Sequence, residues 1–98
     1  MQNSDAIPYD ISYRINPETI FQRVGSDLIV INLKDDRIYS LNKTAGRFWE
    51  LLVSQMTIPE IKKQLSVEFE IEPETLDKEV HTILNNLVQE GLVLANLE

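Results

Sequence analysis

The hydrophobic pattern changes its period at Asn42, and this change constrains the fold more than any other feature of the sequence. Residues 37–41, RIYSL, alternate as in a β-strand, whereas residues 43–54 place apolar side chains at helical spacing. Asparagine is a favoured helix N-cap, so a strand is expected to run directly into a helix here. The sequence therefore predicts a small sheet that leads into a helical bundle.

Two more strands are expected before this one. Residues 20–24 and 28–33 are separated by the turn cluster GSD, and the run LIVINL has the β-branched composition of a central strand. The stretch before them contains two prolines and shows little periodicity. We therefore expect a partly disordered N-terminal arm over residues 1–17 and one domain over residues 18–98.

Two more helices are expected after the first. The letters TIPE at residues 57–60 fit a capping box that opens a helix of roughly 58–67. Pro73 suits the first position of the last helix, and Gly91 suits the position just after its end. The apolar residues 92–94 are interpreted as a short docked strand. The side chains expected in the core are Phe48, Trp49, Leu51, Leu52, Ile61, Leu65, Leu76, Val80, Ile83, Leu84 and Leu87.

Charge is distributed unevenly along the 98 residues. The net charge is −7, yet residues 1–47 hold six acids and six bases, so the excess lies wholly in residues 48–98. Such a half repels nucleic acid and anionic lipid at long range, so neither is expected as a partner. The absence of cysteine excludes disulfides and thiolate metal sites. With no signal-like or membrane-spanning run, the cytoplasm is the expected location.

No motif for catalysis or metal binding stands out. His81 is the one histidine and has no ligand-spaced partners, so it is interpreted as exposed or half-packed. The alternating acids of residues 68–74 lack the spacing and the glycine of a calcium loop and are interpreted as a solvated connector. No Ser or Thr has an evident base, and the glycines form no phosphate-binding loop. The sequence predicts a chain that is not an enzyme and needs no cofactor.

Three helices after a small sheet are also typical of a winged helix-turn-helix that reads DNA. In such proteins the last helix enters the major groove, and phosphate contacts need Lys or Arg. The segment 73–91 has one base, Lys78, against the acids Glu74, Asp77, Glu79 and Glu90. The architecture is therefore expected, but a DNA-reading role is disfavoured.

The ordered set of motifs resembles the PqqD family, whose members are recognition elements for the precursors of ribosomally synthesised, modified peptides (RiPPs). The resemblance covers about residues 18–94, through DLIVINLKDDRIYSLNKTAGRFWELL, TIPEIKKQL and EVHTILNNLVQEGLV. Tyr39 is similar to an aromatic residue often seen in free-standing members of lasso-peptide pathways. Asp36 stands where the family commonly has glycine, which leaves the fold expectation intact because Asp tolerates a left-handed conformation.

This resemblance implies an α+β, winged-helix-like domain, with a three-stranded antiparallel sheet followed by three helices. It also implies that the leader segment of a precursor peptide binds as an added strand between the third strand and the third helix. A maturation enzyme, such as a radical-SAM protein or a leader peptidase, would then receive the peptide. The alternative function is a general protein-interaction or regulatory adaptor. An exposed edge would also permit a homodimer.

The expected binding surface is the free edge of the third strand, where unpaired N–H and C=O groups can accept another strand. The alternative is that the N-terminal arm or the C-terminal tail covers this edge. On the last helix, one flank of the apolar stripe holds Asp77, His81 and Val88, and the other holds Glu79, Asn86 and Glu90. The first flank is favoured because Val88 offers apolar surface, although Val88 also fits the rim of the core. The predicted peptide contacts are Arg37, Ile38, Tyr39, Ser40, Leu41, Asp77, His81, Leu84 and Val88.

Strand alternation also predicts a register. If Ile29, Ile31 and Leu33 form the buried face of the central strand, Leu33 pairs with Arg37 across a three-residue loop, 34–36.

In that register Asp36 is left-handed at the end of the loop, Ile31 lies opposite Tyr39, and Ile29 lies opposite Leu41. Hydrogen-bonded pairs alternate along the ladder, so Ile38 and Ser40 turn their backbone groups to the open edge.

Overall fold

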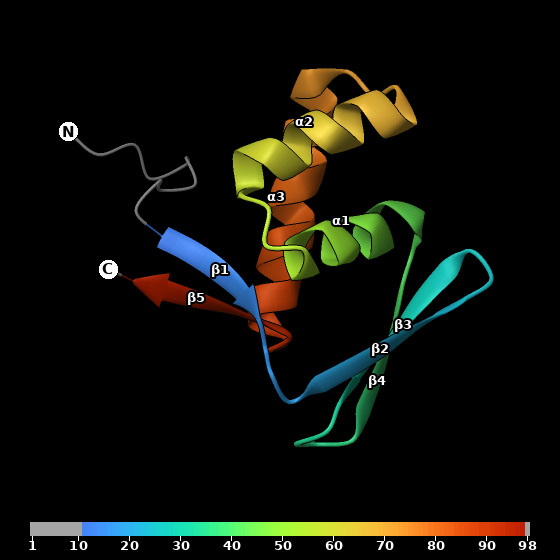
Figure 1. Ribbon diagram of the computed structural model, residues 1–98, viewed down its shortest axis with the longest axis vertical. Coiled ribbons are helices and arrows are strands. Elements are labelled where there is room, and N and C mark those ends of the chain that lie inside the picture. The colour runs from blue at the N-terminus through green and yellow to red at the C-terminus, as the bar shows by residue number, and fades with distance from the viewer. Residues whose placement is uncertain (1–10, 98) are drawn as a thin grey trace.

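The computed structural model describes the backbone of residues 11–97 and the side chains of residues 12–96. Its elements are β1 Ile11–Ile15, β2 Thr19–Val24, β3 Asp27–Asn32, β4 Arg37–Leu41, α1 Lys43–Val53, α2 Ile58–Phe69, α3 Pro73–Gln89 and β5 Val93–Leu97. Figure 1 shows the helices gathered to one side of a hairpin sheet made of β2, β3 and β4. The predicted α+β fold, a three-stranded antiparallel sheet followed by three helices, is confirmed.

A second, two-stranded sheet joins the two ends of the described chain. Strand β1 pairs antiparallel with β5, with Ile11 opposite Leu97 and Ile15 opposite Val93. Part of the segment interpreted from the sequence as an arm, residues 11–15, is therefore a strand, because it finds a partner strand at the far end of the sequence. Residues 1–10 of that arm lie outside the described residues.

Asn16 connects this second sheet to the end of α3 and to the hairpin sheet. Its backbone N–H donates to the carbonyl of Leu92 at 2.9 Å, and its side-chain amide donates to the carbonyl of Gly91 at 2.8 Å. Its own carbonyl accepts from the backbone N–H of Thr19 at 3.1 Å. Asn16 thus holds together the end of β1, the segment that follows α3 and the start of β2.

The helix ends are set by the capping residues that the sequence predicts. The side chain of Asn42 accepts from the N–H of Ala45 at 2.9 Å, and Thr57 and Glu60 form the reciprocal capping box at the start of α2. At the end of α3, Gly91 has φ +77° and its N–H bonds to Val88, while the N–H of Leu92 bonds to Leu87. These two bonds make a Schellman motif, for which glycine is the favoured residue.

The core lies between the inner face of the hairpin sheet and the three helices. Trp49 and Phe48 at its centre are fully buried, and Phe21 of β2 meets the Trp49 ring edge-to-face at 5.8 Å between centroids. The Trp49 Nε1–H is buried without a hydrogen-bond partner among the described residues. Every predicted core residue lies in this cluster, and Ile83 is the one that remains partly exposed.

Gly46 sets how closely α1 approaches the hairpin sheet. A Cβ atom added at this position would lie 3.1 Å from the Cβ of Leu28 on β3 and 3.8 Å from the carbonyl oxygen of Leu41 on β4. Any longer side chain would therefore press on both strands.

The predicted register of β3 and β4 is wrong by one residue. Val30 lies opposite Tyr39 and Asn32 opposite Arg37, so the buried face of β3 is Leu28, Val30 and Asn32. The cause is Asn32, which is only 6% exposed and whose side-chain oxygen accepts from the N–H of Lys34 at 3.0 Å.

The loop between β3 and β4 therefore has four residues, 33–36, instead of three, and Leu33 is exposed to solvent. The backbone N–H of Asp36 donates to the carbonyl of Asn32 at 2.8 Å, which closes the turn. The left-handed conformation predicted for Asp36 is confirmed by its φ of +62°.

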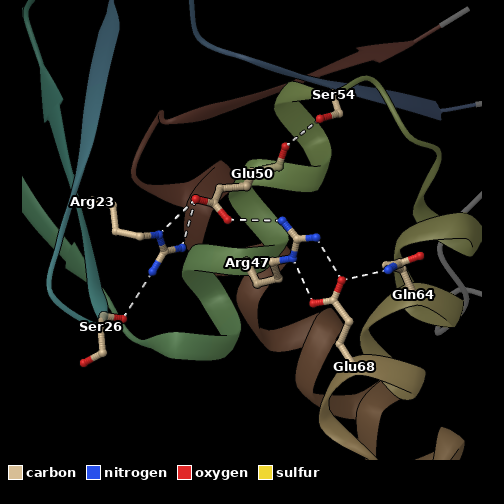
Figure 2. Close-up of polar contacts among 7 residues, drawn as sticks. All are labelled: Arg23, Ser26, Arg47, Glu50, Ser54, Gln64 and Glu68. Carbon is tan, nitrogen blue, oxygen red and sulfur yellow. Dashed lines mark hydrogen bonds and ion pairs between the residues drawn. The ribbon is translucent and has the colours of Figure 1, made fainter.

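A chain of charged side chains connects the hairpin sheet to the helices (Figure 2). Arg23 of β2 contacts Glu50 of α1 at 3.0 Å, and Glu50 also contacts Arg47 at 3.3 Å. Arg47 then forms a two-pronged pair with Glu68 of α2, with N–O distances of 2.9 and 2.8 Å. Gln64 donates to the same carboxylate at 2.7 Å. The network thus links three elements, a geometry in which ion pairs contribute more than isolated surface pairs do.

We expect this network to make stability depend on pH. Hydrogen bonding from Arg47, with Gln64, lowers the pKa of Glu68 from an ordinary value of 4.5 to about 2. A depressed pKa contributes stability above the unfolded-state value and loses it as pH falls toward 2. Glu68→Gln should lower stability at neutral pH by about 1 kcal/mol, because the pair is partly exposed.

Thermal unfolding from pH 7 to pH 2 measures this effect. The gap in Tm between parent and Glu68→Gln should stay constant above about pH 5 and shrink below it. Glu72→Gln is the matched control, since Glu72 forms no ion pair within residues 11–97, and it should run parallel to the parent. A gap that is constant down to pH 2 would contradict the role assigned to Glu68.

Candidate peptide-binding groove

Strand β4 is a free edge of the hairpin sheet. The strand order is β2-β3-β4, and β1 and β5 pair with each other rather than with β4. Within residues 11–97, neither the N-terminal nor the C-terminal segment covers this edge, which removes that alternative for the described chain. An uncovered edge strand is a template for pairing with another chain.

Two backbone hydrogen bonds of β3 determine which groups of β4 point outward. The carbonyl of Asn32 accepts from the loop on the β4 side of β3, whereas the N–H of Leu33 donates to Glu18 on the β2 side at 2.8 Å. Because hydrogen-bonding directions alternate along a strand, the backbone N–H and C=O groups of Leu28, Val30 and Asn32 point toward β4.

Tyr39 and Leu41, which lie opposite Val30 and Leu28, therefore direct their backbone groups toward β3. Arg37 lies opposite Asn32, and its N–H donates to the Oδ1 of Asp35 at 3.1 Å. Ile38 and Ser40 present theirs to the open edge. This part of the sequence prediction survives the register error, because the extra residue entered the loop and left the alternation of β4 unchanged.

A groove opens beside the end of β4 and continues between α2 and α3. Its volume is about 1440 Å³. Ser40 and Leu41 of β4 form one wall, and Ile83 and Leu87 of α3 contribute apolar surface opposite. Farther along, Val67 of α2 is 72% exposed within the same groove. An apolar surface beside an open strand edge is suited to a peptide that pairs through its backbone and anchors through side chains.

Both flanks of α3 contribute to the groove, and the flank that the sequence analysis did not favour contributes more of its residues. Glu79 and Asn86 line the groove. Glu90 lies next to β4, where its Oε1 accepts from the Tyr39 hydroxyl at 3.2 Å and lies 3.8 Å from the Arg37 guanidinium. Hydrogen bonding with Tyr39 and the nearby carboxylates of Asp35 and Glu90 raise the pKa of Arg37.

The predicted α3 contacts are therefore not brought together at the groove. Leu84 is 2% exposed and belongs to the core, and Val88 is half-buried against the core, as the alternative interpretation allowed. His81 is half-buried and does not line the groove. Asp77 does line it and pairs with Lys62, whose hydrogen bond lowers the pKa of Asp77.

On the strand side, Ser40 and Leu41 line the groove, and Arg37, Ile38 and Tyr39 continue the same edge. As contacts to a ligand, all nine residues remain predictions. Groove residues that the sequence analysis missed on α2 are Lys62, Lys63, Ser66 and Val67.

The sheet has a second open edge, on β2. Alternation leaves the backbone groups of Phe21 and Arg23 outward there. Their side chains are already engaged, with Trp49 and Glu50 respectively, and no residue of β2 lines the groove. The groove therefore distinguishes β4 from β2 as a docking edge.

The described residues hold no cluster of His, Asp or Glu arranged to bind a metal ion. In the same part of the chain, no helix has the length and apolar character needed to span a bilayer. The groove offers backbone groups, apolar surface and a charged rim, which are means of binding a peptide.

The family model for "Coenzyme PQQ synthesis protein D (PqqD)" matches residues 27–93, from β3 to the first residue of β5. The chain belongs to the PqqD family. The family predicted from the motifs is thereby confirmed. No curated protein matches this PqqD-family chain.

Two solved structures share the fold at 18% sequence identity. "TbiB1 in Complex with the TbiA(beta) Leader Peptide" has a TM-score of 0.77, over 82% of this chain and 93% of that one. "Lasso peptide synthetase B1 complexed with the leader peptide" also has a TM-score of 0.77, over 85% and 98%. At this level of identity the likeness establishes a common fold.

Proposed function

We propose that this PqqD-family chain binds the leader segment of a ribosomally synthesised precursor peptide and presents it to a maturation enzyme. The leader adds to β4 as a strand and lies between β4 and α3. The observation that carries the proposal is the unpaired β4 edge lying directly beside an apolar groove. Further support comes from the family and from the two proteins of the same fold, which were solved with leader peptides.

Backbone pairing and a few apolar anchors account for the expected affinity. Ile38 and Ser40 offer four backbone groups, and each hydrogen bond formed contributes about 0.5–1.5 kcal/mol net. Leu41, Ile83 and Leu87 supply apolar surface for side chains on the groove side of the added strand. Glu79 in the lining of the groove favours a basic residue in the leader, by at most about 1 kcal/mol while it remains partly exposed to solvent.

In this role the chain performs no catalytic step. The maturation enzyme, a radical-SAM protein or a leader peptidase, carries out the chemistry in the cytoplasm. Pairing of two copies through β4 would occupy the same edge and would compete with the leader.

The direct test uses any short peptides that prove to be encoded beside the gene for this chain. The N-terminal half of each is titrated into the ¹⁵N-labelled protein. A leader is expected to shift the amide signals of Ile38, Ser40 and Glu79 through Glu90, and to leave those of β2 unchanged. Shifts confined to β2, or no binding by any neighbouring short peptide, would favour the general adaptor function.

DNA binding is the alternative that the fold itself suggests, and we expect it to be absent at physiological salt. The last helix and its C-cap residue Glu90 carry four acids against the single base Lys78, so phosphate contacts are disfavoured. Fluorescence anisotropy with labelled random duplex DNA measures this. Micromolar binding with a steep dependence on salt would reverse the order of the two functions.

A further inference from the structure

Three isoleucines form a continuous row across the outer face of the hairpin sheet. Ile20 of β2 lies opposite Ile31 of β3, and Ile31 lies opposite Ile38 of β4. Ile38 is 67% exposed and Ile20 is 50% exposed, while Ile31 between them is half-buried. The next row toward the end of β4 is Gln22, Ile29 and Ser40, which ends in a small polar side chain.

This outer row belongs to the face that points away from the helices. The inner face, with Leu28 and Val30, packs on the core, and Figure 1 shows the helices on that side. Cross-strand pairs of β-branched or aromatic side chains stabilise a sheet, and here the row stops at Ile38 because the sheet stops there.

A strand added to β4 necessarily extends this row by one side chain. Side chains directly opposite each other across a ladder share a face, and successive side chains along a strand alternate between faces. The peptide residue opposite Ile38 must therefore lie on the outer face beside it. The residue opposite Ser40 lies on the same face, and the one between them points to the groove.

We propose that the peptide carries a β-branched or aromatic side chain opposite Ile38 and a small or polar one opposite Ser40. This inference rests on the proposed function and specifies the peptide that the edge selects. The peptide residue opposite Ile38 extends the row of Ile20, Ile31 and Ile38 to a fourth strand. The neighbouring peptide residue, which points to the groove, is selected separately by α3. Ile38 thus determines both specificity and register, since a slip of one residue would turn the apolar side chain into the groove.

A second copy of this chain is a poorer occupant of the outer row. Specific interfaces bury roughly 20–30 residues a side, whereas the outer face exposes four large apolar side chains, Ile20, Val24, Leu33 and Ile38, with Ile31 half-buried. One side chain of an added strand is sufficient to cover Ile38.

The test is a selection from a phage-displayed library of random peptides on the immobilised full chain. Peptides that bind the parent but not Ser40→Pro are taken as edge-dependent. Among these, one position should be enriched in Val, Ile, Thr, Tyr or Phe, with a small or polar residue two positions away. The selection is then repeated on Ile38→Lys, where that position should change to Asp or Glu through an opposite-charge pair.

The matched control is Ile20→Lys, on the same face but two strands from the edge, which should leave the enriched pattern unchanged. Peptides from the parent selection should bind Ile38→Lys about two- to fivefold more weakly than they bind Ile20→Lys. Edge-dependent peptides with no apolar position, or with a position that does not respond to Ile38→Lys, would overturn this inference alone. A pool without any edge-dependent peptide would overturn the strand-addition function, and this inference with it.

Discussion

Replacing Ser40 with proline should weaken leader binding by at least about tenfold while leaving the thermal stability within a few degrees of the parent. Proline removes one N–H that points to the open edge, and its ring obstructs the approaching strand. A lost hydrogen bond and the steric conflict together reach the 1.4 kcal/mol that corresponds to a factor of ten. The ladder between β3 and β4 keeps its bonds, because those come from residues whose backbone groups face β3, such as Tyr39 and Leu41.

The comparison variant is Tyr39→Pro, one residue earlier on the same strand. Its N–H belongs to the ladder with Val30, so its loss should lower the Tm clearly and reduce binding as a consequence of unfolding. Thermal unfolding and isothermal titration on both variants distinguish a direct loss of binding from a loss that follows from unfolding. A Ser40→Pro chain that binds a leader as tightly as the parent would show that the peptide docks elsewhere.

Substituting Gly46 with leucine is expected to be the most destabilising single change at the junction of the sheet and the helices. The first added atom already meets Leu28 at 3.1 Å, and the rest of the side chain must displace β3 and the end of β4. Overpacking of this kind costs about 2 kcal/mol or more, roughly 10 °C in Tm for a domain of this size. Leader affinity should fall as well, because Leu41 lines the groove and would move with its strand.

The graded control for this prediction is Gly46→Ala. Alanine adds only the Cβ and gains helix propensity, so the two effects offset each other and the change in Tm should be small. Denaturation in urea ranks the two variants by stability, and peptide titration ranks them by leader affinity. If the leucine variant were as stable as the alanine variant, the close approach of α1 to the sheet would not be limiting.

Local signals predicted most of the elements because each depends on neighbours in the sequence. The cap at Asn42, the capping box at Thr57 and the stop at Gly91 all act within one helical turn. The apolar stripe of α3 likewise follows from spacing alone, and it lies in the core as predicted. These features required no knowledge of distant contacts.

The errors arose where a distant partner or a polar core residue decides the structure. Strand β1 exists because β5 pairs with it across the whole length of the chain. The register of β4 was missed because Asn32 looks like a surface residue, yet a loop N–H satisfies its side chain and permits burial. In β3, residues of both faces are apolar and one inward residue, Asn32, is polar, so the sequence pattern alone does not say which face is buried.

The groove flank of α3 could not be chosen from a helical wheel. The wheel separates Asp77, His81 and Val88 from Glu79, Asn86 and Glu90, but it does not say on which side β4 lies. The contact between Tyr39 and Glu90 answers this, and it joins residues 51 positions apart.

The pairing of β1 with β5 brings the two ends of the described chain to the same place. Ile11 lies opposite Leu97, and no residue of either strand lines the groove. Ile11 and Leu97, the two ends of the described backbone, therefore lie side by side at a point away from the β4 edge (Figure 1). The sheet that closes the described chain on itself is thus separate from the sheet whose edge is open, so a strand could add to β4 without disturbing the pairing of β1 with β5.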